Sequence, residues 1–169
     1  MAVPLTEEVY QYVEALQSSI PLSTGRFSLT KQCHITLKFL GEDNDGAGVA
    51  ESLEKVDFKA FNLATGELGF FPNKNNPRVF WLGLEELKEL AALAEGVKQA
   101  LPSFKEDHDF HAHITLARIK FLNDKQGFLK AVDAMEKKRI EFPVKSFLLM
   151  KSTLTPKGPV YEIVQEYRG

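Results

Sequence analysis

Cysteine is nearly absent from the chain, which has one such residue, Cys33, among 169. One cysteine excludes an internal disulfide framework and is typical of a protein in the reducing cytoplasm, where we expect this one. No run approaches the roughly 20 apolar residues of a membrane span. Positive charge is not in excess either: 21 basic residues face 23 acidic ones, a net charge of −2. This balance argues against a protein that coats nucleic acid, but it is compatible with a site that binds one phosphate.

The chain has the composition of a soluble globular domain, with 44% hydrophobic and 26% charged residues. Apolar residues at helical spacing predict helices over 6–19, about 49–56, 87–101 and from Asn123 or Asp124 to about 135. Shorter apolar runs between turn signals predict strands at 27–29, 33–40, 60–70, 78–84, 111–121, 142–152 and 159–167.

Histidine is also scarce, and two of the four histidines open the same tetrapeptide, His-Ile-Thr-Leu, at 34–37 and 113–116. Side chains alternate along a strand, so His34 and Thr36 share one face, as His113 and Thr115 do in the second copy. The apolar residues of the first copy share the opposite face: Cys33, Ile35, Leu37 and Phe39. Core packing does not require the same two polar residues in both copies, so the repeat favours a functional site.

The predicted elements also repeat, because the order motif strand, helix, strand, loop, strand occurs twice. We therefore expect an α+β fold in a single bilobal domain over residues 1–169. The first repeat covers about 27–101 and the second about 108–167. Each lobe of this pseudo-symmetric pair has an antiparallel sheet with helices outside, and the cleft lies between the sheets. A pseudo-twofold axis would bring the two motif strands side by side.

Two converging motifs supply an acid/base pair with two hydroxyl donors. Histidine serves as acid or base near neutral pH because its ordinary pKa is about 6.5. Threonine hydroxyls can bind phosphoryl oxygens as negative charge grows on them. The pattern therefore predicts attack on a phosphorus centre without a metal or cofactor, and it leaves open which histidine is the acid.

The motifs carry a family resemblance. Residues 34–41 and 113–118 resemble the paired His-x-Thr-x signatures of the two-histidine phosphoesterases. Phe71-Pro-Asn, residues 78–81 and residues 151–162 are similar to the RNA 2′,3′-cyclic phosphodiesterase branch, first described as 2′-5′ RNA ligases, with archaeal members most alike. The resemblance implies hydrolysis of RNA 2′,3′-cyclic phosphate ends to a 2′-phosphate, with weak reverse 2′-5′ ligation. The implied partners are such RNA ends or small cyclic nucleotides, with no membrane and no obligate protein partner.

The same resemblance implies roles for individual residues. His34 would protonate the leaving 3′-oxygen, and His113 would accept a proton from water. Thr36 and Thr115 would bind the phosphate, and Arg118 stands in the place of the family's arginine. Strict alternation puts Arg118 on the face away from His113, so this contact requires the strand to twist or end near Ala117.

The resemblance has one departure at the amino end. Family members usually open with a short strand before the first helix, whereas residues 1–4 here lead almost directly into that helix. We therefore expect this strand to be missing and a sheet edge to be exposed.

Other interpretations stay open. The cluster Asp107-His108-Asp109-Phe110-His111-Ala112-His113 allows a metallohydrolase, because His111 and His113 share a strand face. A non-catalytic nucleotide or RNA-end binder is the second alternative. A stacking partner for the terminal base is expected among four aromatic residues: Phe39, Phe71, Trp81 and Tyr161.

Overall fold

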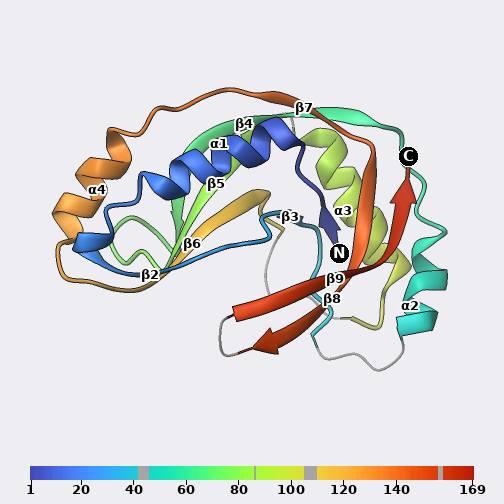
Figure 1. Ribbon diagram of the computed structural model, residues 1–169. Helices are drawn as coiled ribbons and strands as arrows, with labels where there is room; N and C mark the ends of the chain where they lie inside the picture. The colour runs from blue at the N-terminus through green and yellow to red at the C-terminus, as the bar shows by residue number, and fades with distance from the viewer. Residues whose placement is uncertain (42–45, 86, 105–109, 156–157) are drawn as a thin grey trace.

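The computed structural model describes residues 1–41, 46–85, 87–104, 110–155 and 158–169 (Figure 1). Its helices are α1 (Glu7–Ser18), α2 (Gly46–Leu53), α3 (Lys88–Ala100), α4 (Lys125–Asp133) and the short 3₁₀ helix η1 (Leu22–Thr24). Its strands are β1 (Ala2–Val3), β2 (Gly25–Leu29), β3 (Ile35–Thr36), β4 (Phe61–Phe71), β5 (Val79–Glu85), β6 (His113–Leu122), β7 (Glu141–Val144), β8 (Ser146–Thr155) and β9 (Gly158–Arg168). No described helix has the length and apolar character needed to cross a lipid bilayer.

The described strands form one antiparallel sheet in the order β7-β4-β5-β6-β3-β1-β8-β9, with β2 pairing onto β6. The predicted α+β class is confirmed. The two motif strands lie side by side, as expected, and Ile35 of β3 pairs with Ile114 of β6. This pair joins a half made of β7, β4, β5, β6 and β2 to a half made of β3, β1, β8 and β9. The two halves thus share a continuous sheet.

The hairpins cross between the halves. The β4–β5 hairpin follows β3 along the chain but pairs with β6, and the β8–β9 hairpin follows β6 but joins β3 through β1. One strand over 142–152 was expected, and this was wrong. The segment is divided at Lys145, where the chain passes from β7, paired with β4, to β8, paired with β1 and β9. One strand cannot follow both sets of neighbours.

A strand does precede the first helix, so the expectation that it is missing was wrong. Ala2 pairs with Thr36 on one side and with Leu148 on the other. Ala2 and Val3 are 2% and 1% exposed. Two residues are enough here because β1 lies between two strands, not at an edge, and both of its neighbours satisfy its backbone groups.

The first motif strand is shorter than predicted, covering Ile35–Thr36 instead of 33–40. Alternation ends with it. Phe39, expected on the apolar face, is 68% exposed, while Lys38 is 3% exposed. Cys33, Ile35 and Leu37 are buried as expected.

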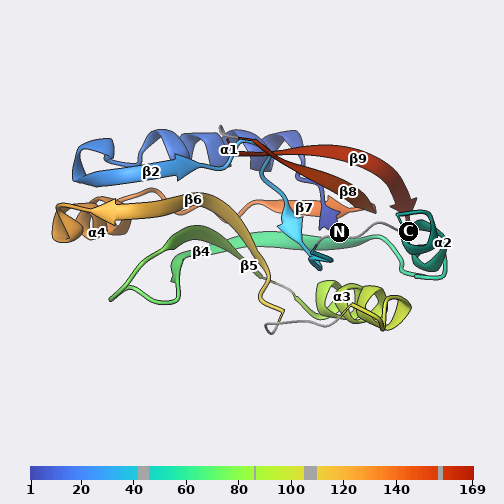
Figure 2. The ribbon, with the colours of Figure 1, turned by 90° about the horizontal axis from the view of Figure 1, so that it is seen from below.

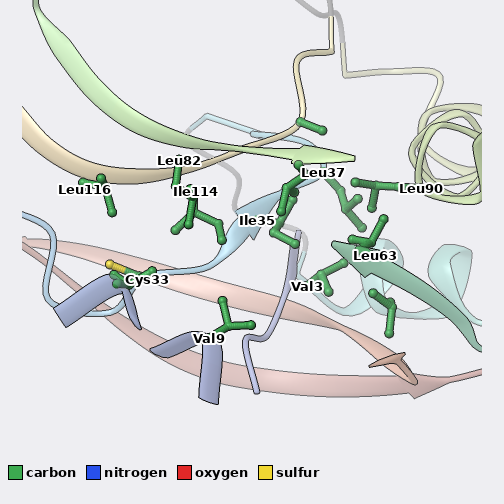
Figure 3. Close-up of a cluster of buried hydrophobic side chains, with 14 of the residues drawn as sticks. Val3, Val9, Cys33, Ile35, Leu37, Leu63, Leu82, Leu90, Ile114 and Leu116 are labelled. Atoms are coloured by element: carbon green, nitrogen blue, oxygen red, sulfur yellow. The ribbon is translucent and has the colours of Figure 1, made fainter. Parts of the chain in front are cut away.

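Helix α1 covers the apolar face of the motif strands. Its buried residues follow helical spacing, and Figure 3 shows Val9 facing Val3, Cys33 and Ile35. The helix predicted to begin at Asn123 or Asp124 is capped by Asp124, whose carboxylate accepts a hydrogen bond from the Gly127 N–H at 2.8 Å. Thr6 is the N-cap residue of α1 but makes no side-chain cap bond. With α1 on the apolar face, the histidine face of both motifs is left for chemistry.

Candidate active site

Register alone assembles four polar side chains. Extending the Ile35–Ile114 pair by one residue each way sets His34 opposite Thr115, and Thr36 opposite His113. Opposite Cβ atoms in an antiparallel pair are about 4.5–5.5 Å apart, and diagonal ones are roughly 7–8 Å apart. The two histidines therefore occupy one diagonal of a square and the two threonines the other. A group the size of a phosphate fits between them.

Both imidazoles are held in the same way. A backbone carbonyl two residues earlier accepts a hydrogen bond from each Nδ1: the carbonyl of Gln32 for His34, at 2.8 Å, and that of His111 for His113, at 2.7 Å. Because a carbonyl can only accept, Nδ1 carries the proton in each ring. The Nε2 atom of each neutral ring then holds a lone pair, which is the form a general base requires.

Burial lowers the pKa of both histidines. Desolvation is the main cause for His34 and for His113, and the carbonyl bond to each Nδ1 offsets part of it. Further positive charge lowers each pKa again, from the amino terminus and then His113 in the case of His34, and from His111 and Arg118 in the case of His113. Both rings are therefore neutral at pH 7 in the free protein. A bound phosphate anion would raise both pKa values.

Gln32 also ties His34 to the far strand of the sheet. Its side-chain N–H donates to the Tyr161 carbonyl at 3.2 Å, and its Oε1 accepts from the Tyr161 N–H at 2.9 Å. The Tyr161 ring meets the His34 ring edge-on, with centroids 5.1 Å apart. The side chain of Gln32 thus fixes β9 while its carbonyl fixes the imidazole of His34.

On the other half, aromatic rings do the equivalent work. The rings of His111 and His113 both lie edge-on to Phe71, at 5.0 and 4.9 Å between centroids. Trp81 lies 5.1 Å from Phe71 and covers Gly69, where an added Cβ would meet the indole at 2.2 Å. This packing gives His113 a rigid apolar wall.

A cavity of about 710 Å³ opens over the motif strands. Its walls include His34, Thr36, Thr115 and Arg118, which come from both halves of the sheet. His113 does not line the cavity, but it lies opposite Thr36, which does. No acidic side chain is among the described residues that line the cavity.

A β-bulge brings Arg118 to this cavity. In the β5–β6 pairing, Trp81 is opposite Thr115 but Phe80 is opposite Ala117, so Leu116 is an extra residue. Leu116 and Ala117 are both fully buried, and alternation restarts with Arg118 on the same face as Thr115. The side chain of Gln17 in α1 donates to the Leu116 carbonyl at 2.8 Å. The required change of face near Ala117 is therefore present.

The candidate metal cluster falls partly outside the described residues, since 107–109 are not among them. Within the described part of the chain, no three His, Cys, Asp or Glu side chains converge to hold a metal ion. The His111 ring packs on Phe71 and Trp81. Cys33 is 8% exposed, and burial raises its pKa to about 11, which suits packing and not nucleophilic attack.

Of the four stacking candidates, Phe39 and Tyr161 line the cavity, whereas Phe71 and Trp81 support His113. Sequence reasoning did not single out Gln32, Arg26 or Lys31, which also lie at the cavity. Gln32 could have been found by its position, because the residue two before each motif histidine holds that histidine's Nδ1. No local pattern marks Arg26 and Lys31, because β2 reaches the site only by pairing with β6.

Comparisons with known proteins show the family to which this chain is similar. Residues 7–155 match the family model of the 2′-5′ RNA ligase superfamily. An RNA 2′,3′-cyclic phosphodiesterase of Archaeoglobus fulgidus is 40% identical over 133 residues, which cover 76% of this chain and 75% of that protein. One of Thermotoga maritima is 33% identical over 174 residues, covering 98% and 92%.

Solved structures share the fold. The protein TT0787 of Thermus thermophilus superposes with a TM-score of 0.80 at 28% identity, covering 99% of this chain and 94% of that one. Apo LigT of E. coli gives a TM-score of 0.76 at 20% identity, with the same coverage.

Replacing Gln32 by Ala should release β9 from the His34 loop. Since burial is the main cause of the lowered His34 pKa, we expect that pKa to rise toward its ordinary value, while the His113 pKa stays unchanged. NMR titration of the imidazole protons measures both, and hydrogen exchange at the Tyr161 amide should quicken. Gln11→Ala, on the exposed side of α1, is the matched control. Unaltered His34 titration and Tyr161 exchange in the Gln32 variant would rule out the positioning role.

Proposed function

Because the chain belongs to the 2′-5′ RNA ligase superfamily, we propose that it hydrolyses 2′,3′-cyclic phosphates at RNA ends without a metal ion. The observation that carries this proposal is the β3–β6 register, which sets two histidines and two threonines on one open face. Relatives that carry the name RNA 2′,3′-cyclic phosphodiesterase support the choice of reaction.

The diagonal arrangement suits in-line displacement at phosphorus. A base on one side of the phosphorus activates water, and an acid on the other side protonates the departing ribose oxygen. Two rings with free Nε2 atoms on opposite corners can perform these two roles on one phosphorus. In keeping with the family resemblance, we assign His113 as the base for water and His34 as the acid for the 3′-oxygen. The product is then a 2′-phosphate.

The remaining polar groups stabilise charge. The hydroxyls of Thr36 and Thr115 occupy the other diagonal, where they can donate to the non-bridging oxygens as these gain charge. Arg118 adds a fixed positive charge on the same cavity wall. Its guanidinium can bind two phosphoryl oxygens at once.

Although both rings are neutral in the free protein, one of them can become the acid when substrate binds. The anionic substrate raises the pKa of both rings, so that one ring can take up a proton from solvent as the substrate binds. The same groups would perform the weak 2′-5′ ligation if a 5′-hydroxyl replaced water: His113 would take the proton of that hydroxyl, the 5′-oxygen would bond to phosphorus, and His34 would protonate the departing 3′-oxygen. We place the reaction in the cytoplasm, on RNA ends or on small cyclic nucleotides.

The direct test is incubation with an RNA that ends in a 2′,3′-cyclic phosphate, in chelator and without added metal. His34→Ala and His113→Ala should each lower kcat by on the order of a hundred- to ten-thousand-fold, because each removes one proton-transfer role. Analysis of the product should find a 2′-phosphate.

His111→Phe is the matched control, since it keeps the backbone carbonyl that holds His113 and removes the one imidazole besides His34 that the structure describes near it. We expect this variant to retain most of its activity. Loss of activity in chelator together with an inactive His111→Phe variant would favour the metallohydrolase. An intact cyclic phosphate after prolonged binding would favour the non-catalytic binder.

The pH dependence follows from the lowered histidine pKa values. Activity falls at low pH as the base becomes protonated and at high pH as the acid loses its proton, so the profile is bell-shaped. For kcat/KM, which reports the free enzyme, we expect the bell to lie below the ordinary histidine pKa of about 6.5. For kcat it should lie at higher pH, because the bound anion raises both pKa values. Two superimposable profiles would contradict a charged phosphate between the rings.

A further inference from the structure

The cavity continues beyond the histidines along a positively charged wall. Four cationic side chains line it: Arg26, Lys31, Arg118 and Lys120. None of the four has an acidic partner within the described part of the chain, whereas Lys74, Lys137 and Arg139 on other surfaces do. A chain with net charge −2 thus concentrates unneutralised positive charge at one cavity. Four cations are more than the binding of a single phosphate requires, and together they attract a polyanion.

The positively charged wall extends away from the motif histidines in one direction. Strands β2 and β6 run side by side away from β3 (Figure 2), with Ser28 opposite Arg118 and Arg26 opposite Phe121. A second register shift on β6, beside the Arg26/Phe27 position of β2, lets Lys120 and Phe121 both reach the cavity. After β3 the chain continues in the opposite direction, toward Phe39. The two motif histidines and two motif threonines therefore lie between Phe39 and the wall formed by β2 and β6.

The wall is apolar as well as basic. Phe121 at its far end is 56% exposed and Leu29, opposite Ala117 at its near end, is 42% exposed, although both are large hydrophobic residues. An exposed aromatic ring next to an arginine is the combination on which unpaired bases stack. Phe121 comes six residues after Thr115 along β6, which at the strand rise is roughly 20 Å. One nucleotide anchored by its phosphate at the histidines cannot extend that far.

We propose that Arg26, Lys120 and Phe121 bind the nucleotides that precede the terminal one in a single-stranded RNA. The inference rests on the proposed function and narrows its substrate from any cyclic nucleotide to an oligonucleotide end. A cyclic phosphate occupies both the 2′- and the 3′-oxygen, so the chain leaves the site only through the 5′-oxygen of the terminal ribose. The Phe39 side accommodates the terminal base, and the wall of β2 and β6 accommodates the preceding backbone.

This assignment predicts the kind of selectivity. Stacking and backbone contacts read no base edges, so the enzyme distinguishes length and strandedness but not sequence. Paired bases cannot offer their faces to Phe121, so a duplex end needs an unpaired 3′ overhang of a few nucleotides.

The test compares kcat/KM on a 2′,3′-cyclic mononucleotide with that on a tetranucleotide ending in the same nucleotide. Wild-type protein should prefer the tetranucleotide. Phe121→Ala should lower its kcat/KM by about tenfold, the loss of one stacked base, and should change the mononucleotide value by less than about twofold. Arg26→Ala and Lys120→Ala should each reduce the salt dependence on the tetranucleotide by a slope of about 0.7.

Two variants on other surfaces are matched controls. Ile163→Ala removes a similarly exposed apolar side chain, 63% accessible, from β9, and Lys88→Ala removes an exposed cation from α3. Neither should alter the preference for the tetranucleotide.

The outcomes separate the two proposals. Failure of the wild-type protein to cleave either substrate would overturn the proposed function. Equal rates on both substrates, with no selective loss in the three wall variants, would overturn the present inference and leave the proposed function standing. Equal losses on both substrates in those variants would also overturn it, because the residues would then act at the cyclic phosphate.

Discussion

The backbone pairing of Ile35 with Ile114 is the contact on which the site depends. It joins strands from two halves of the chain at the centre of one continuous sheet. Because side chains alternate, this single pair puts two isoleucines into the core and leaves a histidine and a threonine from each motif on the open face. A shift of one residue in either strand would exchange the two faces of that strand, placing its imidazole in the core. Fold and chemistry are thus specified by the same register.

Burial of the apolar face makes that register costly to change. Ile35 and Ile114 are fully buried under α1, where they pack with Val9 and Val3 (Figure 3). Moving the histidine and threonine of one motif into this layer would desolvate two polar side chains without partners. The core therefore fixes the relative positions of the motif histidines and threonines, and the carbonyls of Gln32 and His111 fix the ring orientations.

The two halves solve the same problem with different side chains. The residue two before each histidine supplies the Nδ1 acceptor, and its side chain docks on the strands of its own half. Gln32 does so by paired hydrogen bonds to β9, and His111 by ring contacts with Phe71 and Trp81. The two halves are therefore alike in the role of these residues but not in their side chains. The cavity is asymmetric, because among the described residues its basic wall lies on the β2 and β6 side alone.

Local patterns were enough to predict the helices, the paired motif strands, the face that carries His34 and Thr36, and the burial of Cys33. The failures were all non-local. β1 is a strand because two neighbours pair with it, the segment 142–152 divides because it serves two halves, and Phe39 is exposed because β3 ends at Thr36. The bulge that redirects Arg118 depends on pairing with β5 and on Gln17 from α1. Both partners are far away in the sequence, so the residues around Arg118 alone do not predict it.

A crystal structure with a 2′-phosphorylated nucleotide bound would test this pairing of the two histidines most directly. We expect one phosphate between the two rings, with the Nε2 atoms of His34 and His113 each within hydrogen-bond distance of its oxygens and both threonine hydroxyls on the remaining ones. A phosphate bound by one histidine while the other ring points away would contradict it.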